Sequence, residues 1–479
     1  MLKFSSENCL KNRHILLICI ISIGGLLRFW NLGQWSFWID EVLTVLDAEE
    51  FSLSNSPINP IPYIAAKFSI FVGKKLPFVA QGGGEWSSRL IFCIVGILSI
   101  PIVFSLGQAL CNSRVGLLAA MFVALSNWHL FWSQNVRSYI FTFLFAVLTA
   151  WFFYRSLEND STLLTICALF SSICLILSHL LTAAIVPALA VYAILCLSEE
   201  RSRKRWINLL LFFFPFAIPV LMLALPQIRG YVSSGWGHNE WGRSPIYIVL
   251  TLVQGVSIPI AVAAFFAIIV NPFNRPTRFL LCFAGVPLVL LLIASQFQNV
   301  AGYYLFWTTP AYFILAAVAC TYIWDAITGN KYNLLKMLLP TLLIVVLLSQ
   351  NFLYFRYENG GRPKWREAFE TIRDEMNPTD ILVLSEPRMA QYYMHGSKAV
   401  DINELVKDRA AFEKKWESSD EKRLWFIEDV ASFNVFDADM SVRNWIRERG
   451  RMIETLPAFS RAKDRTIHIF LLEKDSVSK

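Results

Sequence analysis

Two adjacent carboxylates, Asp40 and Glu41, are the first residues along the chain whose side chains could carry out chemistry. They end the run Trp35-Ser-Phe-Trp-Ile-Asp-Glu41, so aromatic residues typical of a membrane interface stand directly before them. A carboxylate held there can act as a general base, or it can orient a hydroxyl or amine nucleophile. Two solvated loop acids would give the same local sequence, so the pair indicates a site only in combination with other residues.

A second candidate is Arg137, in the run Trp132-Ser-Gln-Asn-Val-Arg-Ser-Tyr139 between two apolar stretches. The connection is too short to leave the membrane surface, so we expect Arg137 at the outer interface or just inside the helices. An arginine there is costly and usually has a functional partner. Its guanidinium matches phosphate oxygens in a two-pronged geometry, and Tyr139 offers another hydrogen bond. The alternative is an arginine that extends toward lipid headgroups.

Other polar residues flank the same kind of apolar stretch. Glu85 and Arg89 stand at the start of one stretch and could form an interfacial ion pair, and His179 follows another. A lone histidine is more often a packed residue than a ligand. In a later loop, His238 and Glu240 could touch a metal, but two ligands do not make a site. We therefore leave a divalent metal as an open question.

These residues must be positioned by membrane helices. Of the 479 residues, 55% are hydrophobic and only 16% are charged, whereas soluble proteins carry about 25% charged residues. Several apolar runs reach or approach the roughly 20 residues that cross the hydrocarbon layer as a helix. We predict about eleven transmembrane helices, at 14–30, 88–109, 115–132, 138–154, 162–178, 182–197, 206–225, 246–270, 279–295, 304–325 and 336–353.

Positive charge in the short connections sets the expected orientation. The formal net charge is +7, and much of the excess lies at the N-terminus and in alternate connections such as Arg114, Arg155 and the cluster 201–205. Because such loops stay in the cytoplasm, we expect the N-terminus inside and, with an odd number of helices, the C-terminus outside. This placement accounts for the charge without nucleic acid. We expect a multi-pass protein of a bacterial plasma (inner) membrane.

The chain is expected to contain two domains. Residues 1–353 form the transmembrane domain, whose first exported loop spans 31–87, and residues 354–479 form a small soluble α/β domain on the periplasmic or extracellular side. Short apolar runs and helical spacing in the second domain predict a partly parallel sheet with flanking helices. The expected elements are strands at 380–385, 424–427 and 466–472 and helices at 364–376 and 441–449.

The candidate residues belong to a longer pattern that extends over much of the chain. It comprises Arg28 through Asp40-Glu41, Asn59-Pro-Ile-Pro-Tyr63, Glu85-Trp-Ser-Ser-Arg89, Ser133-Gln-Asn-Val-Arg-Ser-Tyr139, Ser178-His179 and Lys364-Trp-Arg-Glu-Ala368. This pattern resembles the GT-C class of membrane glycosyltransferases, in the bacterial branch related to protein O-mannosyltransferases and to the aminoarabinose transferase of lipid A. The resemblance implies a polytopic α-helical fold of GT-C type.

The resemblance also implies roles for individual residues. Asp40 would be the catalytic base or an acid that orients the acceptor, with Glu41 supporting it. Arg137 would bind the phosphate of a polyprenyl-phosphate sugar, and Tyr139 would help to place it. The acceptor would attack the anomeric carbon with inversion, and the polyprenyl phosphate would leave. Further candidates for substrate binding are Arg28, Glu85, Arg89, Gln134 and His179.

Three positions depart from the pattern of the family. Tyr303-Tyr304 stand where the family often has Arg-Tyr before a proline, so a positive charge is missing. Asn59 replaces a histidine of the first loop, and Asn135 stands where an acid is common. Altered specificity and loss of activity would both fit these departures.

The leading interpretation is a glycosyltransferase that moves a sugar from a polyprenyl-phosphate donor to a glycan, lipid or protein acceptor at the exported face, in contact with membrane lipids. A transporter or flippase for a lipid-linked saccharide is one alternative, although such proteins usually contain internal repeats and polar residues near the middle of the membrane. A non-catalytic membrane scaffold is another. The residue types and spacing identify neither the sugar nor the acceptor.

Overall fold

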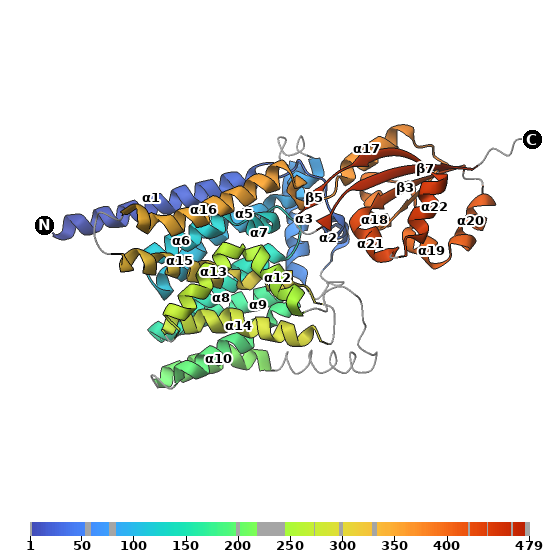
Figure 1. The fold of residues 1–479 in the computed structure, drawn as a ribbon. Coiled ribbons are helices and arrows are strands. Elements are labelled where there is room, and N and C mark those ends of the chain that lie inside the picture. The colour runs from blue at the N-terminus through green and yellow to red at the C-terminus, as the bar shows by residue number, and fades with distance from the viewer. Residues whose placement is uncertain are drawn as a thin grey trace, which may run out of the picture. The chain divides into compact units, whose positions relative to one another are not determined.

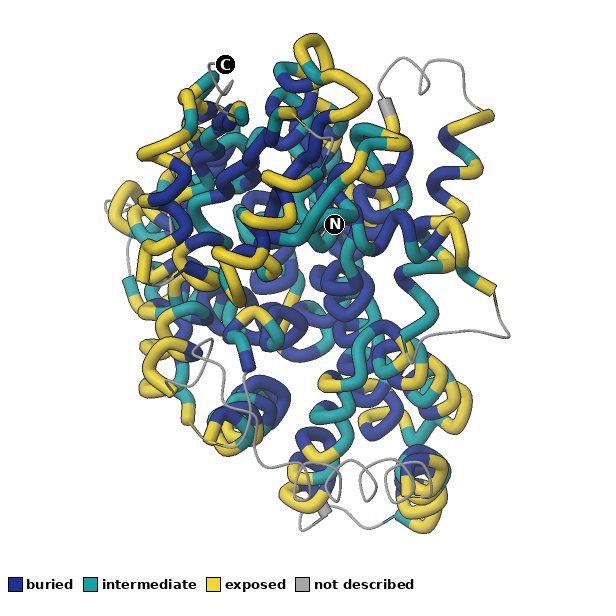
Figure 2. The backbone as a smooth tube through the Cα atoms, turned by 90° about the vertical axis from the view of Figure 1, so that its right-hand side faces the viewer, coloured by how far each residue is buried: buried dark blue, intermediate teal, exposed yellow. Residues whose placement is uncertain are grey.

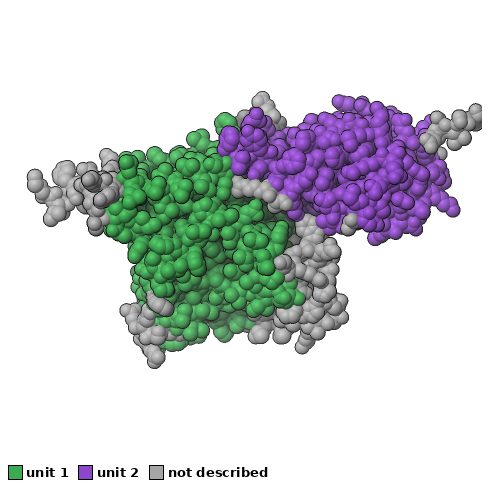
Figure 3. All heavy atoms as spheres, in the orientation of Figure 1, with its two compact units in different colours: residues 1–30, 52–65, 91–350 green, residues 31–51, 66–90, 351–479 purple. Residues whose placement is uncertain are grey.

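The computed structural model describes residues 2–52, 59–75, 83–197, 202–217, 245–272, 274–296, 300–327, 333–419, 422–437, 439–460 and 463–474. The chain divides into two compact units (Figure 3). Unit 1 contains residues 1–30, 52–65 and 91–350, and unit 2 contains residues 31–51, 66–90 and 351–479. Unit 2 therefore joins the C-terminal segment with much of the loop that follows the first helix.

Unit 1 is built from helices (Figure 1). They are α1 (Leu2–Phe29), α6 (Ser113–Leu125), α7 (Asn127–Ser133), α8 (Tyr139–Asn159), α9 (Thr162–Ser178), η2 (Leu180–Ala184), α10 (Ile185–Leu197), a helix at 203–217, α12 (Pro245–Val256), α13 (Ile258–Val270), α14 (Arg275–Ala294), η3 (Gly302–Thr308) and α15 (Thr309–Ala326). Three further helices contribute residues to both units: α3 (Pro60–Lys75), α5 (Gly83–Leu110) and α16 (Asn333–Arg356).

Several of these helices are long and apolar enough to cross a membrane. Within the described residues, five single helices qualify by length and composition, or up to seven spans if each bent pair counts as one. Two shorter apolar helices, Thr162–Ser178 and Leu180–Cys196, accompany them. The chain is a multi-pass membrane protein, and the number of eleven spans stays a prediction.

Two helices that we predicted as continuous are broken. The stretch 115–132 bends by 61° between α6 and α7, and the stretch 246–270 bends by 99° between α12 and α13. At the first break, the hydroxyl of Ser126 caps α7 by accepting the backbone N–H of His129 at 3.3 Å. At the second, Ser257 has a positive φ of 87°, which no residue inside a right-handed helix adopts. The apolar sequence continues through both breaks and therefore conceals them.

Many apolar side chains of unit 1 lie on its surface. The peripheral helices have one exposed side and one buried side (Figure 2). Leu163, Phe170, Ile194 and Phe214 are each exposed over about two thirds of their surface or more. Such a surface would be unfavourable in water, but it is what a helix facing lipid tails requires.

Unit 2 contains a five-stranded sheet with the order β2-β1-β3-β7-β4 (Figure 1). The strands are β1 (Ile381–Leu384), β2 (Lys398–Asp401), β3 (Arg423–Asp429), β4 (Arg451–Leu456) and β7 (Ile467–Glu473). β1 pairs in parallel with β2 and β3, whereas β7 is antiparallel to β3 and β4. A separate short hairpin consists of β5 (Phe459–Ser460) and β6 (Lys463–Asp464). The predicted small C-terminal domain with a partly parallel sheet is confirmed.

Both faces of this sheet are covered. The helices of unit 2 are α2 (Ile39–Glu50), α17 (Trp365–Glu375), α18 (Pro387–Tyr393), α19 (Ile402–Lys407), α20 (Arg409–Glu417), α21 (Val430–Phe436) and α22 (Ser441–Arg449), with a 3-10 turn η5 (Asn359–Gly361). Phe426 and Phe470 pack with Trp445 of α22 on one face. Their strand neighbours Trp425 and Leu471 point to the opposite face and are also buried, and α17 contacts β7.

Candidate active site

The acidic pair lies in the first turn of α2. Trp38 is the N-cap residue, and Glu41, at the third helical position, accepts the backbone N–H of Trp38 at 3.4 Å. Carboxylates in the first turn are favoured by the unpaired N–H groups and the positive end of the helix dipole. The two acids differ in exposure, because Asp40 is partly exposed whereas Glu41 is completely buried. Asp40 is therefore the more accessible of the two carboxylates.

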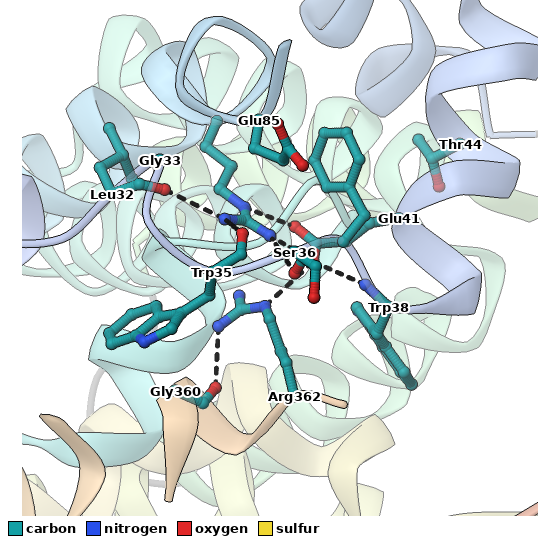
Figure 4. Close-up of polar contacts among 12 residues, drawn as sticks. Leu32, Gly33, Trp35, Ser36, Trp38, Glu41, Thr44, Glu85, Gly360 and Arg362 are labelled. Atoms are coloured by element: carbon teal, nitrogen blue, oxygen red, sulfur yellow. Dashed lines mark hydrogen bonds and ion pairs between the residues drawn. The ribbon is translucent and has the colours of Figure 1, made fainter. Parts of the chain in front are cut away.

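Glu41 is the centre of a buried charge cluster with two arginines (Figure 4). Arg89 donates from Nε to Oε1 and from Nη2 to Oε2, each at 2.9 Å. Arg362 donates from Nε to Oε2 at 3.0 Å. All three side chains have no exposed surface. Burial opposes the charge of Arg362, but the Glu41 carboxylate raises the pKa of this arginine, so the group stays cationic.

The remaining donors of this cluster hold the loop that precedes α2. Arg89 donates to the backbone oxygens of Leu32, Trp35 and Ser36 at 3.0, 2.9 and 3.1 Å. Together with the two bonds to Glu41, these contacts use all five N–H donors of the guanidinium. The loop and the start of α2 are thus fixed around Arg89, which leaves Arg89 no donor for a substrate.

We expect Glu41→Gln to destabilise unit 2 strongly. The substitution leaves two buried guanidinium groups without a carboxylate, and breaking a buried ion pair by removing one partner costs about 3–5 kcal/mol. Thermal unfolding of the full chain in detergent should show a lower transition temperature for this variant. Glu49→Gln is the matched control, since Glu49 lies on the exposed side of the same helix. Equal transition temperatures for the two variants would contradict the role of the cluster.

Glu85 lies in a second buried cluster of unit 2, and the ion pair that we expected between Glu85 and Arg89 is replaced. Arg366 approaches Glu85 to 2.6 Å, and the hydroxyl of Tyr393 donates to the same oxygen at 3.0 Å. Tyr393 in turn accepts the backbone N–H of Phe37 at 2.8 Å. Burial and the charge of Glu85 raise the pKa of Tyr393 well above its ordinary value, so the hydroxyl keeps its proton. The expected pair failed because partners from distant segments satisfy each residue better.

Arg28 is completely buried in unit 1, at the break between α6 and α7. It donates to the backbone oxygens of Val123 and Ala124 at 3.0 Å each and of Gly24 at 2.8 Å. Further contacts reach Nδ1 of His129 at 2.8 Å and Oγ of Ser133 at 3.2 Å. The arginine thereby binds two carbonyl groups in the last turn of α6, where the regular helical hydrogen bonds end.

Gln134 also serves the end of α1. Its side-chain amide donates to the backbone oxygens of Arg28 at 2.9 Å and Trp30 at 2.8 Å. Gln134 is completely buried. The Ser-Gln part of the motif therefore ties α7 to α1, and it fixes the segment that leads to Arg137.

Arg137 follows α7, and Tyr139 begins α8 in an aromatic cluster of unit 1. The ring of Tyr139 lies 4.0 Å from the ring of Trp132, 5.9 Å from His179 and 5.5 Å from Tyr303, measured between centroids. The guanidinium of Arg137 is close enough to His179 for its charge to act on that ring. The structure thus brings Arg137, Tyr139 and His179 together.

Two further features complete the aromatic cluster. The indole Nε1 of Trp132 is buried and finds no hydrogen-bond partner among the described residues. Tyr304 packs against His179 at 5.4 Å, so the tyrosines at the position of the missing family arginine belong to this cluster. The indole N–H of Trp132 and the guanidinium of Arg137 can bind an anionic group. The surrounding rings can bind an apolar chain attached to that group.

The possible metal ligands can be followed only in part. The loop with His238 and Glu240 lies outside the described residues. Within the described ranges, no group of three or more His, Cys, Asp or Glu side chains could hold a metal ion.

Arg362, Tyr393 and Arg465 were missed, because nothing in their local sequence marks them. Arg366 lies inside the segment Lys364-Trp-Arg-Glu-Ala368, so a signal for it was present.

Comparison with known proteins gives one family and several similar structures. The family described as dolichyl-phosphate-mannose-protein mannosyltransferase matches residues 75–223. No curated protein sequence matches the chain. This family match covers the segment that carries Arg89, Arg137, Tyr139 and His179.

The solved structures extend the likeness to nearly the whole chain. ArnT from Cupriavidus metallidurans in the apo state matches with a TM-score of 0.58 at 14% identity, over 95% of this chain and 97% of ArnT. The same protein bound to undecaprenyl phosphate matches with a TM-score of 0.56 at 13% identity, over the same shares. The archaeal oligosaccharyltransferase AglB from Archaeoglobus fulgidus matches with a TM-score of 0.58 at 10% identity, over 98% of this chain and 75% of AglB. The chain is thus a multi-pass membrane protein with the GT-C glycosyltransferase fold, similar to ArnT and to the mannosyltransferase family.

Proposed function

We propose that the protein is a glycosyltransferase that moves a sugar from a polyprenyl-phosphate donor to an acceptor, with inversion at the anomeric carbon. The observation that carries this proposal is the likeness in fold to ArnT over nearly the whole of both chains. One of the ArnT structures is bound to undecaprenyl phosphate, and the AglB structure contains a dolichol-phosphate and an inhibitory peptide. A lipid phosphate and an acceptor of another chemical class are therefore reasonable ligands for this fold.

Arg137 is the proposed contact for the donor phosphate. The aromatic cluster around Tyr139 offers apolar surface for the lipid, and Trp132 contributes an unpaired buried donor among the described residues. A guanidinium binds phosphate oxygens through two parallel hydrogen bonds. As the bond to the sugar breaks, negative charge grows on the phosphate, and Arg137 stabilises that charge. Tyr139 and His179 hold the phosphate end of the donor beside the guanidinium.

Asp40 is the proposed general base for the acceptor. A hydroxyl or amine of the acceptor gives its proton to the Asp40 carboxylate while its oxygen or nitrogen attacks the anomeric carbon. The bond from that carbon to the phosphate oxygen breaks, and the electron pair leaves with the polyprenyl phosphate. Glu41, Arg89 and Arg362 position Asp40 by fixing the start of α2, because both guanidinium groups are bonded to the Glu41 carboxylate.

We place this reaction at the exported face of a bacterial plasma membrane. The basic connections favour a cytoplasmic N-terminus and an exported C-terminal domain. The donor carries its own leaving group, the polyprenyl phosphate, so the reaction needs no nucleotide at that face. The sugar, the acceptor and a contribution of a metal ion are to be identified by assay.

The test separates bond cleavage from lipid transport. The purified protein in liposomes receives synthetic polyprenyl-phosphate sugars, with membrane extracts as a source of acceptor, and free polyprenyl phosphate is measured. Acceptor-dependent release of polyprenyl phosphate supports the glycosyltransferase. Movement of the intact donor across the bilayer without release would instead identify a flippase. Neither release nor movement, across a panel of hexosyl and pentosyl donors, would favour the scaffold.

A further inference from the structure

Arg465 is held in a defined position next to the N-cap of α2. It follows the hairpin of β5 and β6, and its backbone N–H donates to the carbonyl of Ala458 at 2.8 Å. The next residue, Thr466, donates its N–H to the Asp464 carboxylate at 2.9 Å. The guanidinium carbon lies 5.8 Å from the centroid of the Trp38 ring, within the range of a cation–π contact. Trp38 precedes Asp40 by two residues.

The guanidinium of Arg465 has an unused donor. Its Nε is buried and finds no hydrogen-bond partner among the described residues. Buried donors in proteins are nearly always paired, so a buried and unpaired one calls for an explanation. Arg89 and Arg28, by contrast, use all their donors inside the protein. Arg465 differs in this respect from Arg89 and Arg28.

Arg465 and Lys463 are neighbouring cations in electrostatic range of Asp429. Arg465 lies in electrostatic range of Asp40, Asp429 and Arg362. Burial lowers its pKa, although the two carboxylates oppose this shift. Burial, followed by the charge of Arg465, also lowers the pKa of Lys463 to about 8. Two neighbouring cations whose charge is disfavoured in this way gain stability when an anion arrives.

Asp429 compensates these cations only in part. Its carboxylate accepts the hydroxyl of Ser432 at 2.6 Å and the backbone N–H of Ala431 at 3.3 Å, so it caps the start of α21. Burial raises the pKa of Asp429, which weakens its hold on a full negative charge. The other carboxylate in range is Asp40, the proposed base, and it must stay available for the acceptor.

We propose that Arg465, supported by Lys463 and the ring of Trp38, binds an anionic group of the acceptor, a carboxylate or a phosphate. This inference rests on the proposed function, because it assigns the ligand to the acceptor through the neighbouring Asp40. Arginine combines a bidentate fork for such anions with a flat face that stacks on tryptophan. The anion would anchor the acceptor while a separate hydroxyl or amine reaches Asp40. The C-terminal domain thereby selects acceptors by charge.

Direct anion binding tests this site without any transferase assay. The full chain carrying Arg137→Ala, which removes the proposed donor contact, is titrated calorimetrically in detergent with inorganic pyrophosphate and, separately, with succinate. We expect at least one of the two anions to bind, and its affinity to fall by about tenfold or more when Arg465→Ala is added. The anion with the greater loss distinguishes a phosphate-bearing from a carboxylate-bearing acceptor.

Controls keep this result specific. Arg451→Ala removes an exposed arginine from β4 of the same domain and should leave the affinity unchanged. Arg465→Lys should bind the anion with intermediate affinity, because the charge remains while the fork is lost. Binding that is equally strong in Arg465→Ala, or no binding of either anion, would overturn the proposal.

Kinetics then separate this proposal from the proposed function. If the wild type transfers sugar, Arg465→Ala should raise the KM for the acceptor and leave the KM for the donor unchanged. An unchanged acceptor KM in this variant would overturn the proposal while the glycosyltransferase activity stands. A wild type that binds pyrophosphate through Arg465 but transfers no sugar would contradict the proposed function and leave the anion site intact.

Discussion

Asp40→Asn is expected to abolish sugar transfer while the protein still accumulates in the membrane. The amide cannot accept the proton of the acceptor, and loss of a general base lowers a rate by about 10²- to 10⁴-fold. The fold should survive, because Asp40 is partly exposed and the buried contacts of the α2 turn belong to Glu41. The measurement is the rate of polyprenyl phosphate release by wild type and variant at equal protein amounts.

Asp47→Asn is the matched control for that substitution. Asp47 lies on the same helix, and its ion pair with Arg388 is partly exposed on both sides. Exposed pairs contribute about 0–1 kcal/mol, so this variant should transfer sugar at a rate close to that of wild type. Equal activity of wild type and Asp40→Asn would remove Asp40 from the mechanism.

Arg137→Ala is expected to lower transfer by roughly 10²- to 10³-fold, the usual loss when a group that stabilises developing charge is removed. The donor KM should rise and kcat should fall, since the guanidinium contacts the phosphate before and during bond cleavage. The acceptor KM should stay unchanged. Steady-state kinetics with varied donor and fixed acceptor measure both effects.

Two comparisons make this second prediction specific. Arg155→Ala replaces an exposed arginine of α8, the helix that follows Arg137, and should leave the transfer rate nearly unchanged. Arg137→Lys keeps the charge but loses the two-pronged geometry, so it should recover only part of the rate. If Arg137→Ala altered the acceptor KM alone, the arginine would belong to the acceptor side of the reaction.

The membrane helices could be predicted because their signal is long and local. Apolar runs such as 138–154 and 162–178 carry the signal by themselves, and the structure has α8 and α9 at these places. The bends at Ser126 and Ser257 could not be predicted in the same way. A bend depends on which hydrogen bonds replace the helical ones, and at Ser126 these come partly from Arg28, almost a hundred residues earlier.

In the C-terminal domain, too, the elements with a strong local signal could be predicted and the others could not. β1, β3 and β7 are buried and rich in apolar residues, so their runs predicted strands. β2 and β4 were missed because they are edge strands with many polar or exposed residues, of which Lys398 and Arg451 are examples. An edge strand is defined by its neighbour more than by its own composition.

The candidate site depended on long-range pairing in a similar manner. Asp40, Glu41 and Arg137 were found from residue types beside apolar runs. The partner of Glu41 from the C-terminal segment, Arg362, lies 321 residues further along the chain. A local pattern cannot reveal such a pair. It also could not show that Glu41 is buried in ion pairs while its neighbour Asp40 stays accessible.

Transfer of a labelled sugar in membranes tests the proposed reaction without purification of the protein. Membranes that contain either wild type or Asp40→Asn receive radiolabelled polyprenyl-phosphate sugars, and the products are separated by mobility. We expect label to pass to an acceptor in wild type only, with release of polyprenyl phosphate. The mobility of the product then shows the class of acceptor. Label that stays on every donor tested, with wild-type protein that is folded and abundant, would contradict a glycosyltransferase.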